Sequence, residues 1–207
     1  MATEETIRYK ARKEGSMHRH SRLFGNLLTA VGLMAVLLGY ALMAPSTKAY
    51  VTEGIRWVDN WHVYYTMKPM QSYDSQAWTD GVWAWNNSAA PVFFYGGGSQ
   101  IIMFDANDGA NGYDGWTTWG VNTSNCTYPS GYNQLKVANV KLNYYYTQSY
   151  SPTTRKGVAA HELGHALGLA HASTTAAVMY YKTGVRPTVP QQDDINGINY
   201  IYAHSCN

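Results

Sequence analysis

Four short segments of the chain combine β-branched and aromatic residues, partly alternating with polar ones, and they predict β-strands. Such residues fit the half-buried surface of a pleated sheet. A further segment, residues 106–134, is rich in Gly, Asn and Asp, which indicates turns and loops. The predicted strands are residues 55–67, 92–95, 100–105 and 136–146.

A first helix is predicted over residues 72–87, because apolar side chains recur there at helical spacing. Asp74 or Ser75 is a suitable N-cap, since a short polar side chain can accept a hydrogen bond from the first helical turn. The apolar side chains expected near one face are Ala77, Trp78, Val82, Trp83 and Trp85.

Two more helices are predicted late in the chain. Residues 151–167 begin with Ser151 followed by a proline, as helix starts often do, and residues 190–202 follow Thr188 or Val189 as the cap. Strands concentrated in the first half and helices in the second indicate an α+β fold.

The N-terminal part differs from the rest of the chain. Residues 1–22 carry six Lys or Arg against three Glu, and residues 23–44 are apolar without a charged residue. This order predicts a secretory signal cut before Tyr50, or an uncleaved membrane anchor, since the apolar run is long enough to span a bilayer. Both alternatives place the following residues outside the cytoplasm. We therefore expect a signal or anchor at 1–49 and one domain at 50–207.

Charge and composition exclude two classes of protein. From residue 50 onward the chain has eight Lys or Arg and ten Asp or Glu, so it lacks the basic excess of a nucleic-acid-binding domain. Its 18 Tyr and 7 Trp exclude an intrinsically disordered protein. Cys126 and Cys206 are the two cysteines, and in an exported chain we expect them to form a disulfide; two free thiols are the alternative.

Residues 161–171 read HELGHALGLAH and hold three of the five histidines of the predicted domain. Helical residues four apart point to the same side, so His161 and His165 can reach one zinc ion. Gly168 can end the helix in a left-handed conformation, after which the chain turns back and His171 approaches from another direction. Three imidazoles leave a fourth position for water, which is typical of a catalytic zinc site.

Glu162 follows His161 directly, so its side chain is rotated by about 100° around the helix and is not expected to bind the metal. From that position it can accept a proton from the attacking water and later pass it to a leaving amine. The pattern therefore predicts a general base for peptide-bond hydrolysis.

The segment HELGHALGLAH resembles the HExxHxxGxxH pattern of the metzincin metalloproteases. Met179, eight residues after His171, is similar to the Met-turn of that class, and QQDDINGINYIY resembles the last helix of the matrixins, its matrix-metalloproteinase branch. The resemblance covers residues 52–203. It implies a twisted, mostly parallel five-stranded sheet with three helices, and a cleft that binds a protein or peptide substrate in extended form along an edge strand.

Two departures from the matrixin pattern concern the metal site. Matrixins usually carry a second zinc bound by upstream histidines, and His62 is the only upstream histidine of the predicted domain, so we expect one zinc. Tyr181 stands two residues after Met179, where astacins and serralysins place a tyrosine near the zinc. The resemblance implies that Tyr181 contacts the metal or the oxyanion; a buried packing tyrosine is the alternative.

The turn-rich segment carries a weaker hypothesis, a structural calcium site. Calcium prefers oxygen ligands in flexible loops, although the spacing of the EF-hand is not met here. An ordinary loop is the alternative. The candidate side chains are Asp105, Asn107, Asp108, Asn111 and Asp114.

Together these patterns predict a zinc-dependent metalloendopeptidase that is secreted, or anchored with its catalytic domain outside, and that acts as a monomer. The alternative is a zinc-stabilised cell-surface binding module without catalysis. Glu162 favours the enzyme, because a module that had lost catalysis would often have lost its base.

Overall fold

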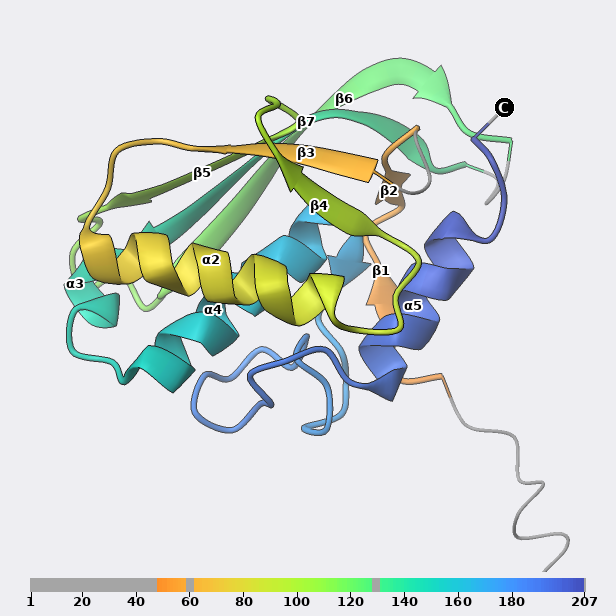
Figure 1. The fold of residues 1–207 in the computed structure, drawn as a ribbon. Coiled ribbons are helices and arrows are strands. Elements are labelled where there is room, and N and C mark those ends of the chain that lie inside the picture. Colours follow the sequence, from red (N-terminus) through yellow and green to blue (C-terminus); the bar gives the residue numbers. More distant parts are fainter. Residues whose placement is uncertain (1–47, 59–61, 128–130, 207) are drawn as a thin grey trace, which may run out of the picture. The chain divides into compact units, whose positions relative to one another are not determined.

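A six-stranded sheet forms one layer of the domain (Figure 1). The computed structural model describes residues 48–58, 62–127 and 131–206. Five strands run parallel in the order β2-β7-β5-β3-β4, and β6 is added antiparallel to β7. This mixed, mostly parallel architecture confirms the predicted fold class, although the described residues form six strands in this sheet and four helices instead of the predicted five and three. The strands are β2 (Ile55–Arg56), β3 (His62–Met67), β4 (Phe93–Gly96), β5 (Ile101–Ala106), β6 (Gly115–Asn125) and β7 (Asn133–Asn143).

Helices α2 (Ser72–Asn86) and α4 (Pro152–Ala166) lie side by side against one face of this sheet (Figure 1). The other two helices of the described residues are α3 (Tyr144–Thr147) and α5 (Gln192–Tyr202). The largest fully buried side chains of the core include Trp57, Trp78, Trp85, Met103 and Leu163. The apolar spacing along the two long helices is therefore explained by their packing against the sheet.

The predicted strand over residues 55–67 is divided in the structure. Its first part, β2, pairs with β7 at one edge, whereas its second part, β3, pairs with β5 and β4. Trp57 lies between the two parts and is buried, and its indole N–H donates to the carbonyl of Ala166 at the end of α4, 2.9 Å away. The aromatic residue that indicated a continuous strand thus connects the chain to the helical layer.

Strand β6 lies inside the segment that the sequence predicts to be loop, so that part of the prediction was wrong. The strand contains two glycines and several polar residues, and its pairing with β7 shifts register on both sides of Val121. Tertiary pairing with β7 supplies the hydrogen bonds that the weak local β-propensity does not predict. Among the described residues, the loop prediction holds for residues 107–114, 126–127 and 131–132.

The first helix begins at Ser72 as predicted, but its cap was placed three to four residues too late, at Asp74 or Ser75 instead of Gln71. Helix α2 begins at Ser72, after Gln71, and Asp74 is buried inside its first turn, where its Oδ2 accepts a hydrogen bond from Thr147. Trp83 was also misplaced, because it is 62% exposed rather than part of the buried face. Its neighbours Val82 and Trp85 are buried, as the spacing predicts.

The caps of the late helices show one correct and one incorrect prediction. Ser151 is the N-cap of α4, and its hydroxyl accepts from the N–H of Thr154 at 3.1 Å. Helix α5 is capped by Gln191 instead of Thr188 or Val189. Strand β7 ends at Asn143, three residues before the predicted end at Tyr146, because the Asn143 side chain caps α3.

The C-terminal segment is tied to the sheet by a disulfide between Cys126, after β6, and Cys206, after α5. The 80 residues of separation make a long closed loop, which stabilises the fold by about 4 kcal/mol in the chain-entropy description. Within the described ranges we find no helix with the length and apolarity needed to cross a membrane. The apolar run at 23–44 lies outside those ranges.

Candidate metal centre

Helix α4 ends so that its motif turns back on itself. Leu167 is the C-cap, and Gly168 follows with φ of +98°. A Cβ at Gly168 would lie 2.3 Å from the carbonyl oxygen of Ile55, so only glycine fits this turn. The short strand β8 (Leu169–Ala170), paired antiparallel with β1 (Val51–Thr52), then leads to His171.

The three histidines of the motif converge. The potential ligand atoms of His161, His165 and His171 all lie within 4.8 Å of one another, and this is the only such group among the described residues. His161 and His165 are buried or nearly so, whereas His171 is exposed at the cleft. The distance between the Nε2 atoms of His161 and His165 is 3.1 Å.

Backbone carbonyl groups hold the other nitrogen of two rings. Nδ1 of His161 lies 2.9 Å from the oxygen of Val178, and Nδ1 of His165 lies 2.8 Å from the oxygen of Leu169. A carbonyl oxygen can only accept, so each Nδ1 carries the proton and each Nε2 presents its lone pair to the centre. Burial also lowers the pKa of His161 well below its usual range and that of His165 to about 4, which keeps both rings neutral.

This arrangement fits a divalent metal ion. Two unprotonated Nε2 atoms 3.1 Å apart direct their lone pairs at the same space, and their repulsion is relieved by a cation between them. Neutral imidazoles with the second nitrogen hydrogen-bonded are the usual zinc ligands of catalytic sites.

The turn that carries Met179 packs closely against α4. Met179 is buried, and a Cβ at Gly164 would lie 2.2 Å from its sulfur, so glycine at 164 permits this close packing. The Asp194 carboxylate of α5 accepts from the N–H groups of Val178 and Met179 at 2.9 and 3.1 Å. Because the Val178 carbonyl holds His161, the turn positions a member of the metal centre.

Glu162 is buried beside the histidines, with 5% of its surface exposed. Its Oε2 accepts from the Thr117 hydroxyl of β6 at 2.7 Å. Burial raises the pKa of Glu162 to about 7, against the lowering effects of the Thr117 hydrogen bond and the charge of Arg186. A Cβ at Gly115 would lie 2.6 Å from Oε1, so glycine lets β6 approach the carboxyl group.

These groups line one open cleft of about 320 Å³. Strand β6 contributes one wall, and the indole N–H of Trp119 donates to the His165 carbonyl at 3.1 Å, which fixes the strand to α4. Tyr181 lines the cleft with 60% of its surface exposed, and its ring centroid lies 6.4 Å from that of His171. Tyr181 is therefore not a buried packing residue.

Sequence reasoning missed the contributions of Gly115, Thr117, Trp119 and Arg186 to the cleft. The first three belong to β6, which was predicted to be loop. The tryptophans and β-branched threonines of residues 116–119 are types that favour strands and could have indicated one here.

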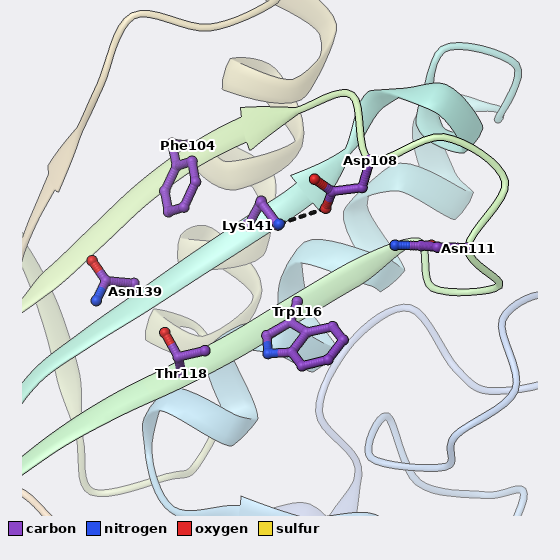
Figure 2. A pocket seen from close by; sticks show the side chains of 7 residues that line it. All are labelled: Phe104, Asp108, Asn111, Trp116, Thr118, Asn139 and Lys141. Atoms are coloured by element: carbon purple, nitrogen blue, oxygen red, sulfur yellow. Dashed lines mark ion pairs between the residues drawn. The ribbon is translucent and has the colours of Figure 1, made fainter.

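Of the side chains proposed for calcium, Asp114 lines the cleft beside the histidines, and Asp108 and Asn111 are shown in Figure 2. Asp108 pairs with the Lys141 ammonium group at 2.5 Å, and the Asn143 amide donates to the Gly109 carbonyl, the Asn111 side chain and the Tyr113 carbonyl. A separate cavity of about 550 Å³ lies beside the loop of residues 105–114, over β5, β6 and β7 (Figure 2). Its lining residues are Phe104, Asp108, Asn111, Trp116, Thr118, Asn139 and Lys141.

The fold and this centre define a metallopeptidase catalytic domain: a mostly parallel sheet backed by a helix whose histidines converge beside a buried carboxyl group. A family description of the matrixins (Peptidase_M10) matches residues 68–203, and the chain belongs to this family. It is a family of zinc-dependent endopeptidases and so implies zinc.

Curated relatives match shorter stretches. Neutrophil collagenase of Homo sapiens is 54% identical over 54 residues, which is 24% of this chain and 11% of that protein. Metalloendoproteinase 2-MMP of Arabidopsis thaliana is 43% identical over 54 residues, or 25% of this chain and 14% of that protein. Stromelysin-1 of Equus caballus is 39% identical over 79 residues, which is 36% of this chain and 17% of that protein. The chain thus matches less than a fifth of the length of these relatives.

Proposed function

We propose that the chain is a zinc-dependent endopeptidase that hydrolyses protein or peptide substrates, with His161, His165 and His171 as zinc ligands and Glu162 as general base. The observation that carries this proposal is the pair of unprotonated Nε2 atoms, 3.1 Å apart, beside a buried carboxyl group in an open cleft. Zinc bound there supplies Lewis acidity for the scissile carbonyl group.

Glu162 accepts the proton of the attacking water and later passes it to the leaving amine. The Thr117 hydroxyl holds Oε2, which orients the carboxyl group and leaves Oε1 for proton transfer. Among the described strands, β6 pairs only with β7, so its other edge offers N–H and C=O groups to an extended peptide. The substrate then lies along β6 with a peptide bond at the histidines.

The substitution Glu162→Gln tests this function. It keeps the size and polarity of the side chain but removes the base, so hydrolysis of a fluorogenic peptide library is expected to fall by at least about 10²-fold while zinc content stays near one per chain. Asp80→Asn, on the outer part of α2, is the matched control and is expected to keep full activity.

Two outcomes decide against the enzyme. Full activity of the Glu162→Gln variant removes Glu162 from the mechanism. A wild-type protein that holds zinc tightly but cleaves no peptide of the library favours the alternative, a zinc-stabilised binding module.

We also propose that the turn at Met179 supports the metal centre from below and that Tyr181 contacts the metal or the oxyanion. The exposed Tyr181 ring beside His171 supports this role. The substitution Tyr181→Phe is expected to lower kcat by about 10-fold without loss of zinc, whereas unchanged kcat removes the hydroxyl from the reaction.

Export is a proposal of the same kind. Residues 1–49 would act as a signal or anchor and residues 50–207 as the extracellular catalytic domain, monomeric in solution. N-terminal sequencing of protein from the culture medium is expected to start at Tyr50 if the signal is cut, and protein found only in the membrane fraction supports the anchor. Calcium binding at residues 105–114 stays a prediction, and Lys141 and Asn143 already engage several of the loop's oxygens.

A further inference from the structure

The cavity of about 550 Å³ over β5, β6 and β7 lies outside the proposed peptidase mechanism (Figure 2). On β7, Asn139 and Lys141 line the cavity and are partly exposed, whereas Val140 between them is buried. Because successive side chains of a strand point to opposite faces, the cavity lies on the face of the sheet opposite to the buried core. Its volume falls in the range that is typical of small-molecule sites.

Two aromatic side chains line the cavity, Phe104 of β5 and Trp116 of β6. Both are in register with Lys141 of β7, so their backbones stand two strand spacings apart, about 10 Å, in one row across the sheet. Trp116 is 47% exposed, and Tyr113 packs against its ring in a T-shaped contact with the centroids 5.3 Å apart. This contact restricts the ring, so the row presents an ordered aromatic surface to a ligand.

The neighbouring row of the sheet supplies polar groups. Thr118 of β6 lies directly opposite Asn139 of β7 (Figure 2). The Thr118 hydroxyl, the Asn139 amide and the Trp116 indole N–H make no hydrogen bond to any residue that the structure describes. An amide and a hydroxyl can each donate and accept, so these groups suit a ligand that does both.

The two charged side chains of the cavity neutralise each other. The Lys141 ammonium group pairs with the Asp108 carboxylate, and none of the other described residues that line the cavity is charged. A charged group that leaves water is stabilised only where it finds a partner of opposite charge. The cavity offers no such partner that is free, so it suits an uncharged ligand.

We propose that this cavity binds an uncharged oligosaccharide, with a sugar ring stacked on Trp116 and sugar hydroxyl groups bonded to Asn139 and Thr118. The C–H groups on one side of a sugar ring carry a partial positive charge, and they pack on the negative face of an aromatic ring. Sugar hydroxyl groups donate and accept, as the free polar groups of the cavity do. A specific protein partner fits less well, because its interface buries a larger surface around a more apolar centre. The binding depends neither on zinc nor on Glu162.

Titration calorimetry on the full chain tests this binding. The probes are four uncharged tetrasaccharides, built from glucose, N-acetylglucosamine, mannose and galactose, and one heparin tetrasaccharide as the charged arm. We expect at least one uncharged tetrasaccharide to bind saturably with a Kd at or below about 1 mM, and the heparin tetrasaccharide to bind more weakly. No binding of any uncharged probe overturns the proposal. Tightest binding of the heparin tetrasaccharide shows a charge effect and overturns it as well.

Variants locate the bound sugar. Trp116→Ala is expected to raise the Kd by at least about 10-fold, and Asn139→Ala by about 5-fold. Trp83→Ala, which removes a 62% exposed tryptophan from α2, is the matched control and is expected to keep the wild-type Kd. An unchanged Kd in both cavity variants, or an equal loss in Trp83→Ala, overturns the proposal. If Trp116→Ala does not fold, as judged by circular dichroism, Asn139→Ala still decides.

Peptide hydrolysis separates this site from the peptidase centre. Asn139 does not line the catalytic cleft, so Asn139→Ala is expected to cleave peptides at the wild-type rate; Trp116 lines both cavities and cannot make this distinction. Loss of hydrolysis together with binding in Asn139→Ala shows general damage to the sheet and overturns the proposal. A wild type that binds sugar but cleaves no peptide contradicts the peptidase function alone. Self-association seen by sedimentation and abolished by Trp116→Ala identifies the cavity as an interface between copies and overturns sugar binding.

Discussion

The histidine centre and the acidic loop of residues 105–114 both gather side chains that can bind metals, but their donor atoms are used differently. At the centre, backbone carbonyls hold Nδ1 of two histidines, and the Nε2 lone pairs face one another without a proton between them. In the loop, Asp108 pairs with Lys141. The Oδ1 atoms of Asn107 and Asn111 accept from backbone N–H groups two residues on.

The difference teaches how a metal site is distinguished from a polar loop. A ligand atom prepared for a metal is oriented by bonds to its neighbouring atoms while it stays unpaired itself. An oxygen that already accepts from the protein's own ammonium or amide groups must lose those bonds before it can bind an ion. The sequence shows only residue types, which are suitable in both regions, and the structure shows which atoms remain free.

The largest expected effect is the loss of the centre by His165→Ala. Two remaining imidazoles hold zinc poorly, so zinc content is expected to fall from about one to near zero per chain, and peptide hydrolysis with it. Elemental analysis after dialysis measures the metal, and a thermal scan with and without chelator measures its contribution to stability. His62→Ala, an exposed histidine outside the centre, serves as control. Retained zinc in the His165→Ala variant contradicts the assigned ligands.

The next largest effect is expected from Asp194→Asn, which weakens the turn at Val178 and Met179 that holds His161. The Asp194 carboxylate accepts from the N–H groups of Gln191, Val178 and Met179. An amide cannot accept all three, so the free energy of unfolding is expected to fall by about 2–3 kcal/mol, and zinc affinity by about 10-fold because the Val178 carbonyl moves. Urea unfolding and a zinc competition titration measure the two effects.

Asp193→Asn is the control for that experiment, because it changes the neighbouring acid of the same helical turn without touching the Met179 turn. Similar losses of stability and zinc affinity in both variants mean that negative charge at the start of α5, and not the Met179 turn, causes the effect. An unchanged zinc affinity in Asp194→Asn separates the turn from the metal centre.

Much of the centre could be predicted from sequence because helical geometry is local. The spacing of His161, His165 and Glu162 on one helix determines which side chains share a side, and Gly168 marks the turn back. The same reasoning predicted the fold class and the packed faces of the long helices. These features depend on residues close together in the chain.

The other wall of the cleft could not be predicted, because it depends on distant pairing. Strand β6 is held by β7 and by contacts to α4, such as Thr117 to Glu162 and Trp119 to the His165 carbonyl. Its glycines and asparagines indicate loop when only neighbours in sequence are considered. Arg186 carries no local signal either, since its unpaired N–H groups follow from burial beside α4.

A smaller effect, on the pH dependence of stability, is expected at Asp74. Like the histidine centre, this buried carboxyl group has an atom without a hydrogen-bond partner, but it is not part of a metal site. Its Oδ1 has no hydrogen-bond partner, and burial raises its pKa to about 6 from the usual 3.8. The folded state therefore holds the proton more tightly than the unfolded state. Stability is greatest below about pH 4 and falls as the pH rises to about 6, by an amount on the order of 2 kcal/mol.

The substitution Asp74→Asn is expected to remove that fall, so the variant gains stability relative to wild type as the pH rises from 4 to 7. Thr147 can still donate to the amide oxygen, and the amide N–H can face Asp105, which opposes ionisation of Asp74 in the wild type. Unfolding measured across this pH range, with Asp80→Asn as control on the same helix, gives the difference. Parallel curves for wild type and Asp74→Asn show that Asp74 titrates normally.

The smallest effect is expected from Lys141→Met, which bears most directly on the acidic loop. The pair with Asp108 is partly exposed, with 23% and 28% of the two side chains accessible, so its loss is expected to cost less than about 1 kcal/mol. The exposed Lys136→Met on the same strand is the control. Because the ammonium group occupies the Asp108 carboxylate, calcium at about 1 mM is expected to leave the Tm of the wild type unchanged and to raise that of Lys141→Met slightly. A clear calcium-dependent rise in the wild type identifies the loop as a metal site after all, because calcium then competes successfully with a bonded lysine. In that case unpaired donor atoms are not what separates the two regions, and the number of oxygens within reach becomes the better criterion.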